Sequence, residues 1–364
     1  MAFTNDALNA FLKTAAEAAR SGKPARVFLG NEASDLDSMA SSVLYAWSKG
    51  AISDGLSNLP VMNIPREDFS LRTEAAWLFQ ESGVDARNLV FLDEIDAGRL
   101  FAAGGSKLVL VDHNKLSAVQ AAWAGAVEGI IDHHADEGLY PQAKKTIEPT
   151  GSASTLVAEV LLAPGTAKLE AGAAVLALGT ILLDTVNLDP EAKRVTPRDE
   201  AVAKRLLEVS GADRKVLFDR LQFEKFNVAA LSSRDILRKD YKEYRMGSLL
   251  CGMSSALLPL ADWMKKDPRL EDSYRKYREE RKLDVLLVMS AYTAPEFTRE
   301  LAVHAADAQL RKRLYDFMNQ AGLGLASLKT ASAANGNTDY YSQADLSQSR
   351  KKLQPLLSEF LQKG

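Results

Sequence analysis

The sequence is poor in cysteine, with Cys251 as its single thiol. One cysteine cannot form a disulfide within the chain, so the sequence favours a reducing compartment and a buried, unreactive Cys251. The N-terminus lacks the basic and apolar regions of a signal peptide. No stretch approaches the ~20 consecutive apolar residues that a membrane-spanning helix needs. These absences predict a soluble cytoplasmic protein that does not associate with membranes.

The chain also lacks an excess of charge of either sign, because its formal net charge is −3 over 364 residues at pH 7. This mild charge argues against a general polyanion binder, so any affinity for phosphate must come from a local group of basic residues. Aromatic residues make up only 7% of the chain, and few lie beside basic residues near the motifs described below. Since single strands of nucleic acid are bound by aromatic stacking, we do not expect a nucleic-acid partner.

The length of the chain suggests two domains. In its first half, short apolar runs alternate with helix-like stretches, which is typical of a parallel sheet covered by helices. We therefore predict an α/β fold. The predicted strands are residues 26–30, 60–64, 89–93, 107–112 and 129–132, and the predicted helices are residues 5–20, 38–49, 73–82, 117–124, 154–162, 171–183 and one that begins at Pro197 after a Thr196 cap.

The pattern changes after residues 211–230, and we place the domain boundary at 215/216. The second half has two predicted strands, residues 247–258 and 283–291. Charged stretches at 264–282 and 297–318 have helical character, and the small polar residues 331–340 predict a mobile loop. A basic segment at 349–352 leads into a C-terminal helix. These features predict a second, smaller α/β domain over residues 216–364.

Three of the four histidines lie in two short motifs, each at the end of an apolar run. The motifs are Asp112-His113-Asn114 and Asp132-His133-His134, and a third run is followed by Asn31, Asp35 and Asp37. Side chains at the carboxyl ends of parallel strands meet at one edge of the sheet. Carboxylates with few imidazoles suit Mg²⁺ or Mn²⁺ better than Zn²⁺. The pattern therefore predicts a metal-dependent hydrolase.

Asp184 belongs with this group, because it ends a strongly apolar stretch and a carboxylate there needs a counter-charge such as a metal ion. Each feature also has a simpler explanation. The Asp35-Leu36-Asp37 segment could be a solvated loop, and Asp184 could be a polar group at a surface helix end. Two adjacent imidazoles after Ile130-Ile131 are harder to explain without a partner.

Together these motifs resemble the DHH phosphoesterase superfamily, whose ordered signatures are Asp-x-Asp, Asp-His-Asn, Asp-His-His and a helix with a final Asp. The resemblance covers residues 26–190. Ser349-Arg350-Lys351-Lys352 resembles the signature of the DHHA2 domain, and residues 240–244 resemble a further segment of it. DHHA2 occurs in family II inorganic pyrophosphatases, prune-type phosphoesterases and yeast-type cytosolic exopolyphosphatases. The resemblance thus implies a DHH domain over 1–215 and a DHHA2 domain over 216–364.

One departure from the pyrophosphatase pattern concerns Asn31. The pyrophosphatases have a histidine ligand where this chain has Asn31, which offers only a weak oxygen ligand. Gly30-Asn31-Glu32 followed by Asp35, Asp37 and Ser38 resembles the yeast-type exopolyphosphatase instead. The resemblance therefore implies hydrolysis of the terminal phosphoanhydride of inorganic polyphosphate, with release of orthophosphate.

The resemblance also implies roles for individual residues around two divalent cations, Mg²⁺ or Mn²⁺. One cation would take Asp35 and Asp112, with Asn31 as a weak ligand or substrate contact. The other would take Asp37, Asp112, His133 and Asp184, so that Asp112 bridges. His134 would contact phosphate or protonate the leaving group, and Asp132 and His113 would orient the ligands from behind.

The substrate phosphate also needs positive charge. Lys242, Arg350 and Lys351 of the second domain are the candidates, since Arg binds phosphate through two donors and Lys as a point charge. A solvated basic helix start is the alternative explanation for residues 350–352. For a long polyphosphate, further cations are candidates: Lys115, Lys144, Lys145, Arg194 and Arg198.

Three other functions remain open at this point. The first is a prune-like or pyrophosphatase-like enzyme that acts on short substrates. The second is a nucleotide phosphodiesterase or an exonuclease, against which the scarcity of aromatic residues near the motifs argues. The third is an inactive scaffold, against which the complete set of acidic and histidine residues argues.

Overall fold

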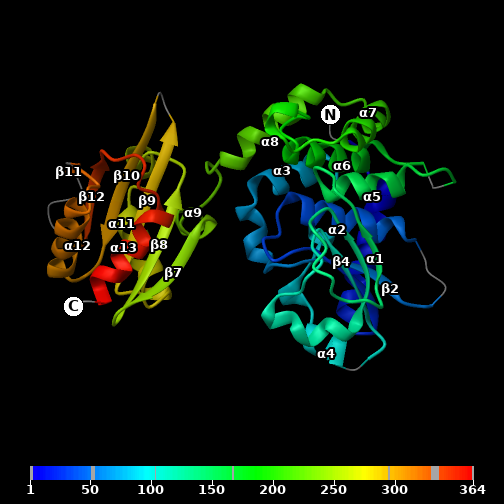
Figure 1. Ribbon diagram of the computed structural model, residues 1–364, viewed down its shortest axis with the longest axis horizontal. Coiled ribbons are helices and arrows are strands. Elements are labelled where there is room, and N and C mark those ends of the chain that lie inside the picture. Colours follow the sequence, from blue (N-terminus) through cyan, green and yellow to red (C-terminus); the bar gives the residue numbers. More distant parts are fainter. Residues whose placement is uncertain are drawn as a thin grey trace. The chain divides into compact units, whose positions relative to one another are not determined.

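The computed structural model describes residues 3–50, 54–102, 104–165, 168–293, 296–328 and 336–362. It divides into two compact units, Met1–Phe226 and Asn227–Gly364 (Figure 1). Helix α8 (Arg214–Phe226) ends the first unit, so the break follows this helix.

The first unit is built on a six-stranded sheet with the order β3-β2-β1-β4-β5-β6. Every neighbouring pair in this sheet is parallel. The carboxyl ends of its strands therefore share one edge, as the sequence predicts. Its strands are β1 (Ala25–Leu29), β2 (Ser57–Met62), β3 (Val90–Phe91), β4 (Lys107–Val111), β5 (Val127–Asp132) and β6 (Lys144–Ile147).

Helices cover both faces of this sheet, because alternate residues of each strand point to opposite faces. Phe28, Val109 and Ile131 pack into a core with α2 (Leu36–Ser48), α3 (Thr73–Glu81), α5 (Ala153–Leu161) and α6 (Ala171–Asp184). Leu29 and Leu110 face the other side, where α1 (Asp6–Ser21) and α4 (Ala97–Ala102) contribute. The predicted α/β fold is confirmed for this unit.

The start of α7 (Pro197–Ser210) shows how local sequence sets these elements. Thr196 accepts a hydrogen bond from the Asp199 backbone N–H, and the Asp199 carboxylate accepts one from the Thr196 backbone N–H. Pro197 occupies the first helical position, where its missing N–H is not needed. This capping box fixes the loop before α7 as well as the helix.

The second unit contains a mixed six-stranded sheet with the order β11-β12-β10-β9-β8-β7. Only β8 and β9 are parallel among its described strand pairs. Its strands are β7 (Tyr241–Met246), β8 (Leu249–Ala256), β9 (Val285–Thr293), β10 (Phe297–His304), β11 (Leu325–Ser327) and β12 (Thr338–Gln343).

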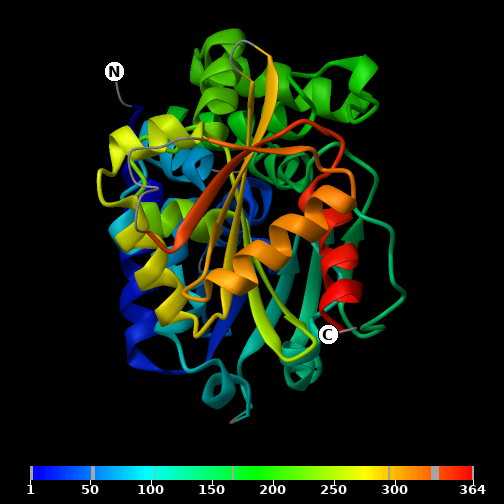
Figure 2. The same cartoon turned by 90° about the vertical axis from the view of Figure 1, so that its left-hand side faces the viewer.

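Two groups of helices cover the second sheet. Helices α12 (Ala308–Gln320) and α13 (Arg350–Gln362) lie side by side on one face, where Phe317 stacks on Phe360 (Figures 1 and 2). The other face packs against α9 (Ser233–Lys239), α10 (Leu260–Lys266) and α11 (Leu270–Glu280), and Trp263 is fully buried there. Cys251 is buried in the core beneath α12 and α13.

Three predicted elements differ from the structure. Residues 118–126 form a 3-10 helix, and residues 264–282 are divided between α10 and α11. The predicted helix over 297–318 is wrong in its first part, because β10 pairs with β9 and β12 there and only α12 is helical. Residues 331–335 of the predicted loop lie outside the described residues, and residues 338–340 belong to strand β12 and not to a loop. No helix in the described ranges is both long enough and apolar enough to cross a bilayer.

Candidate active site

The candidate site is a cavity of about 370 Å³ at the carboxyl edge of the first sheet. Loops after β1, β4 and β5 contribute to it, together with the loop before α5 and the end of α6. The structure brings together all five predicted metal ligands, with His134, Asn31 and Arg194 beside them. The residues that line the cavity are Asn31, Asp35, Asp37, Asp112, His133, His134, Thr150, Gly151, Asp184 and Arg194.

Asp37 lies in the first turn of α2 and is buried. Its carboxylate accepts hydrogen bonds from the Ser41 hydroxyl at 2.8 Å and from the backbone N–H groups of Ala153 and Ser154 at 2.6 and 2.9 Å. These two N–H groups begin α5, so the helix N-terminus stabilises the negative charge. Burial nevertheless raises the pKa of Asp37, because it disfavours the charged carboxylate. The negative charge of Asp35 raises this pKa further.

Asp112 is the first residue after β4 and has a positive φ of 62°, which Asp adopts more readily than most residues. One carboxylate oxygen accepts hydrogen bonds from the Asn31 amide at 2.9 Å and the Ser38 hydroxyl at 2.7 Å. The other faces His133 Nε2 at 3.3 Å. Burial and the charge of Asp37 raise the pKa of Asp112 to about 7.

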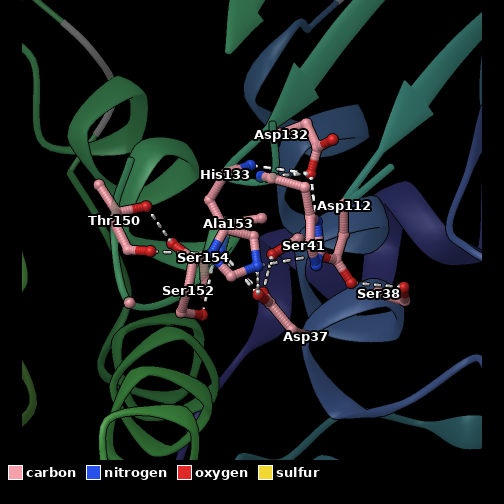
Figure 3. Close-up of polar contacts among 12 residues, drawn as sticks. Asp37, Ser38, Ser41, Asp112, Asp132, His133, Thr150, Ser152, Ala153 and Ser154 are labelled. Atoms are coloured by element: carbon pink, nitrogen blue, oxygen red, sulfur yellow. Dashed lines mark hydrogen bonds and ion pairs between the residues drawn. The ribbon is translucent and has the colours of Figure 1, made fainter. Parts of the chain in front are cut away.

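His133 lies between three partners in the close-up of the site (Figure 3). Its Nδ1 is 2.8 Å from the Thr150 carbonyl, an acceptor, so Nδ1 carries a hydrogen. Nε2 is therefore turned towards Asp112 and, at 3.9 Å, towards Asp37. Burial alone would lower the pKa of His133. The hydrogen bond with Asp112 and the charge of Asp37 outweigh the effect of burial and raise this pKa to about 10. The Thr150 contact orients the ring as in metal-binding histidines.

His134 is held by Asp132 at the rim of the cavity. Its Nδ1 is 2.8 Å from the fully buried Asp132 carboxylate, while 58% of its side chain remains exposed. This hydrogen bond raises the pKa of His134. Asn114 donates a hydrogen bond to the other Asp132 oxygen at 2.5 Å. Asp132 thus orients His134 and keeps it ready to carry a proton.

Asp184 and Asp35 complete the acidic lining. Asp184 ends α6, and its Oδ2 is buried without a hydrogen-bond partner. Burial raises the pKa of Asp184 well above its usual value, and the charge of Asp37 adds to the effect. Asp35 is exposed, caps α2 and accepts a hydrogen bond from the Ser38 N–H at 3.1 Å. Four carboxylates so close together repel one another unless cations balance them.

The side-chain amide of Asn31 is engaged at both ends. Its NH₂ group donates to Asp112, and its Oδ1 accepts a hydrogen bond from the Ser34 N–H at 3.1 Å. Asn31, which stands where the related pyrophosphatases have a histidine ligand, therefore orients Asp112 in this structure.

His113 is not among the residues that line the cavity. Its Nδ1 is 3.0 Å from the Val111 carbonyl, and its Nε2 is buried without a partner. The orienting contact from this motif comes from the adjacent Asn114, which the sequence interpretation did not single out. Burial lowers the pKa of His113, so the neutral ring is favoured.

The predicted phosphate-binding residues Lys242, Arg350 and Lys351 belong to the second unit. Arg350 is 13% exposed, forms an ion pair with Asp240 at 2.5 Å and donates to the Asp240 carbonyl at 2.6 Å. Lys242 on β7 and Lys351 on α13 are exposed. Their contact with substrate remains a prediction.

Three residues of the site were not anticipated in these roles. Ser38 donates to Asp112, the Thr150 carbonyl orients His133, and Ser152 hydrogen-bonds Asp184. Ser38 follows Asp37 directly, so its position in the motif was a usable signal. The contact from Thr150 is made by its backbone carbonyl, which every residue has, so the residue type could not predict it.

The donor set fits a divalent cation. Ligand atoms of Asp112, His133 and His134 lie within 4.8 Å of one another, and the unpartnered Oδ2 of Asp184 supplies a further acceptor. Carboxylate oxygens with one or two imidazoles are the ligands that Mn²⁺ and Mg²⁺ accept. The outer contacts from Thr150, Ser38 and Asn31 give the second layer that such sites have.

Comparison with known proteins supports this interpretation. Residues 27–180 match the DHH family, N-terminal domain, and residues 219–360 match the DHHA2 domain. Exopolyphosphatase PRUNE1 from Rattus norvegicus is 33% identical over 96% of this chain and 78% of its own length. A "Putative exopolyphosphatase" from Schizosaccharomyces pombe is 33% identical over 91% of this chain and 89% of its own length.

A more distant relative is a "Probable manganese-dependent inorganic pyrophosphatase" from Thermotoga maritima, which is 26% identical over 60% of this chain and 40% of its own length. The sequence-based resemblance is therefore confirmed in both halves of the chain. The protein belongs to the DHH phosphoesterase superfamily, in the group that carries a DHHA2 domain.

Proposed function

We propose that this protein is an exopolyphosphatase, which hydrolyses the terminal phosphoanhydride of inorganic polyphosphate and releases orthophosphate. The observation that carries the proposal is the convergence of Asp37, Asp112, His133 and Asp184 in one cavity with His134 at its rim. Relatives named exopolyphosphatases that align over more than nine-tenths of the chain support the choice of substrate.

Two divalent cations, Mn²⁺ or Mg²⁺, would bind this cavity. We assign Asp35 and Asp112 to one and Asp37, Asp112, His133 and Asp184 to the other, so that Asp112 is shared. When bound, such a pair supplies an activated water and stabilises the charge of the transferring phosphoryl group. The manganese-dependent name of the Thermotoga maritima relative agrees with this choice of metal.

His134 is the proposed general acid. Its hydrogen bond to Asp132 favours the protonated ring, and its exposure at the rim leaves Nε2 free to face a substrate. Cleavage of the P–O–P bridge leaves negative charge on the departing phosphate oxygen. A proton from His134 neutralises that oxygen, and solvent can then reprotonate the ring.

The substrate would be drawn from the cytoplasm, where we expect the protein to act. Lys242, Arg350 and Lys351 remain our candidates for binding phosphates from the second unit. A second candidate function is the hydrolysis of short substrates such as pyrophosphate, which the Thermotoga maritima relative favours. The replacement of a histidine ligand by Asn31 argues for longer chains.

Phosphate release from pyrophosphate, tripolyphosphate and long-chain polyphosphate, each with Mn²⁺, Mg²⁺ or a chelator, tests the proposal. We expect turnover of tripolyphosphate and long chains to exceed that of pyrophosphate, and to stop when the metal is chelated. Pyrophosphate as the best substrate would establish the second function instead. Full activity after exhaustive chelation would overturn the assignment of metal ligands.

A further inference from the structure

Arg194 has a distinctive position in the cavity. It lies in the loop between the 3-10 helix Pro190–Ala192 and α7, and it is the single Lys or Arg among the residues that line the cavity in the described part of the chain. The other lining residues include four carboxylates. Arg194 therefore places a permanently charged guanidinium in the lining of the cavity, where an anionic substrate would bind.

The guanidinium of Arg194 is also free of the ion pairs that engage most other cations considered for the substrate. Lys115 pairs with Glu137 at 3.4 Å, Lys145 with Asp136 at 3.2 Å and Arg198 with Glu159 at 2.5 Å. Arg194 has no side-chain hydrogen bond or ion pair with any described residue, although acidic groups line the same cavity. It therefore does not serve as a structural counter-charge for them.

The loop that carries Arg194 is held against the cavity wall by Asp199, which is fully buried. The Asp199 carboxylate accepts hydrogen bonds from the N–H groups of Gly151 at 2.8 Å and Thr196 at 2.7 Å, and from the Thr155 hydroxyl at 2.5 Å. These contacts join the loop before α7 to the start of α5 and to the cavity wall.

Gly151 allows this close approach. A Cβ atom at Gly151 would overlap the Arg194 carbonyl oxygen and would also crowd Thr185 Cγ2. The absence of a side chain thus lets the Arg194 backbone lie against the Thr150–Gly151 segment, whose Thr150 carbonyl orients His133. The position of Arg194 is consequently coupled to that of the proposed metal ligand.

We infer that Arg194, held against Gly151 by the Asp199 network, binds a phosphate group of the substrate directly from the first unit. This inference rests on the proposed function for the identity of the substrate, a phosphoanhydride. A guanidinium can donate two parallel hydrogen bonds to phosphate, which suits a residue at the rim of a site whose inner groups bind cations. Asp199 acts as a positioning residue and does not contact the substrate.

The test compares Arg194→Gln with Lys193→Gln. Both variants lose one positive charge from adjacent exposed positions of the same loop, but Lys193 does not line the cavity. Imidodiphosphate, a phosphoanhydride analogue with a bridging nitrogen that resists hydrolysis, serves as the probe, and calorimetry measures its dissociation constant in Mn²⁺-loaded protein. Mn²⁺ binding is measured on the same samples.

We expect Arg194→Gln to weaken imidodiphosphate binding by roughly tenfold or more, since hydrogen bonds to charged groups are among the strongest. Lys193→Gln should stay within about twofold of wild type, and both variants should bind Mn²⁺ normally. Arg194→Lys should recover only part of the loss because lysine lacks the planar fork. Equal binding by Arg194→Gln and Lys193→Gln would overturn the inference.

The same samples separate this inference from the proposed function. If wild type binds imidodiphosphate and Mn²⁺ but releases no phosphate from polyphosphate, the proposed function fails while the comparison of the two variants still decides the role of Arg194. If wild type releases phosphate from polyphosphate but does not bind imidodiphosphate, the proposed function stands and the inference about Arg194 is overturned. Reduced Mn²⁺ binding in Arg194→Gln would assign the residue to the integrity of the metal site and contradict direct phosphate binding.

Discussion

Asp112 concentrates several constraints on one residue. It is buried, has a positive φ of 62° and contacts Asn31, Ser38 and His133. Asn adopts this backbone conformation about as readily as Asp does, whereas for Ala it is less favourable. Asp112→Asn therefore removes the charge without straining the turn after β4, which makes it a sharper test than truncation.

We expect Asp112→Asn to lower phosphate release by at least ~100-fold and to weaken Mn²⁺ binding, because even the loss of an outer contact to a metal ligand costs 10–100-fold. Asp136→Asn is the matched control, since Asp136 is an exposed acid paired with Lys145. Calorimetry with Mn²⁺ and a phosphate-release assay measure the two effects. Activity of Asp112→Asn within tenfold of wild type would exclude Asp112 as a shared ligand.

Asn31 is the second informative residue, because it replaces a histidine of the related pyrophosphatase motif and orients Asp112. Asn31→His would exchange the amide for an imidazole with a single N–H. We expect the ratio of pyrophosphate to tripolyphosphate turnover to rise by roughly tenfold, a typical size for discrimination between similar substrates. The ratio of kcat/KM values on the two substrates measures this effect, and an unchanged ratio would show that chain length is selected elsewhere.

At the scale of elements, the first sheet was predictable because its central strands are continuous apolar runs. Residues 107–112 and 129–132 correspond closely to β4 and β5. The edge strand β6 was missed, since Lys144–Ile147 has two lysines and no fully buried residue. Such a strand is defined by its pairing with β5, which local sequence does not encode.

Strand β10 was missed for a different reason. Residues 297–304 contain Arg299, Glu300 and Ala302, which favour a helix locally. Pairing with β9 and β12 over the whole segment overrides that preference. The site also combines features that local sequence predicts with features that it does not. The acids and histidines at strand ends were predictable, whereas the contacts of the Thr150 carbonyl and of Asp199 join segments that are distant in the sequence.

His304, the last residue of β10, should make the stability of the second unit depend on pH. His304 is buried, its Nδ1 contacts the Thr338 hydroxyl at 2.8 Å, and its Nε2 lacks a partner. Burial lowers its pKa to about 4, and the charges of Arg278, Arg311 and Arg275 add to this effect. The unfolded state binds the proton more tightly, so the neutral ring stabilises the fold above about pH 6.5 and this stability is lost as the pH falls towards 4.

The free energy of unfolding of the second unit should fall by on the order of 3 kcal/mol, because the pKa of His304 is 6.5 in the unfolded chain and about 4 in the folded one. Hydrogen exchange of β9, β10 and β12 amides at pH 7 and pH 4.5, corrected for the intrinsic exchange rate, measures it. His304→Gln cannot titrate and should show a smaller pH dependence, even if its stability at pH 7 is lower. An equal pH dependence in both proteins would assign the effect to other groups.

At the scale of the whole molecule, the role of the second unit depends on which of its cations are structural. Arg350 is committed to Asp240 and to the Asp240 carbonyl within that unit, whereas Lys351 is exposed. We expect Arg350→Ala to lower the stability of the second unit by ~1–3 kcal/mol, as the loss of a partly buried charged hydrogen bond does.

Lys351→Gln should leave this stability unchanged and lower kcat/KM on polyphosphate if Lys351 binds substrate. Urea unfolding and phosphate-release kinetics on both variants separate the two roles. Normal kinetics in Lys351→Gln would leave the site of the first unit intact but remove Lys351 from the substrate contacts.

The last prediction concerns how far the effect of metal extends. Every proposed ligand lies between Asp35 and Asp184, within the unit Met1–Phe226. A metal that binds only the folded state stabilises it by ~2.7 kcal/mol at a concentration 100 times its dissociation constant. Mn²⁺ should therefore slow hydrogen exchange in β4, β5 and α6, where the ligands converge, and leave β8, β9 and β10 unchanged. Chelation should reverse the effect, and Asp112→Asn should reduce it. Equal protection of the second unit by Mn²⁺ alone would show that ligands from Asn227–Gly364 bind the metal, and would contradict a site built by the first unit.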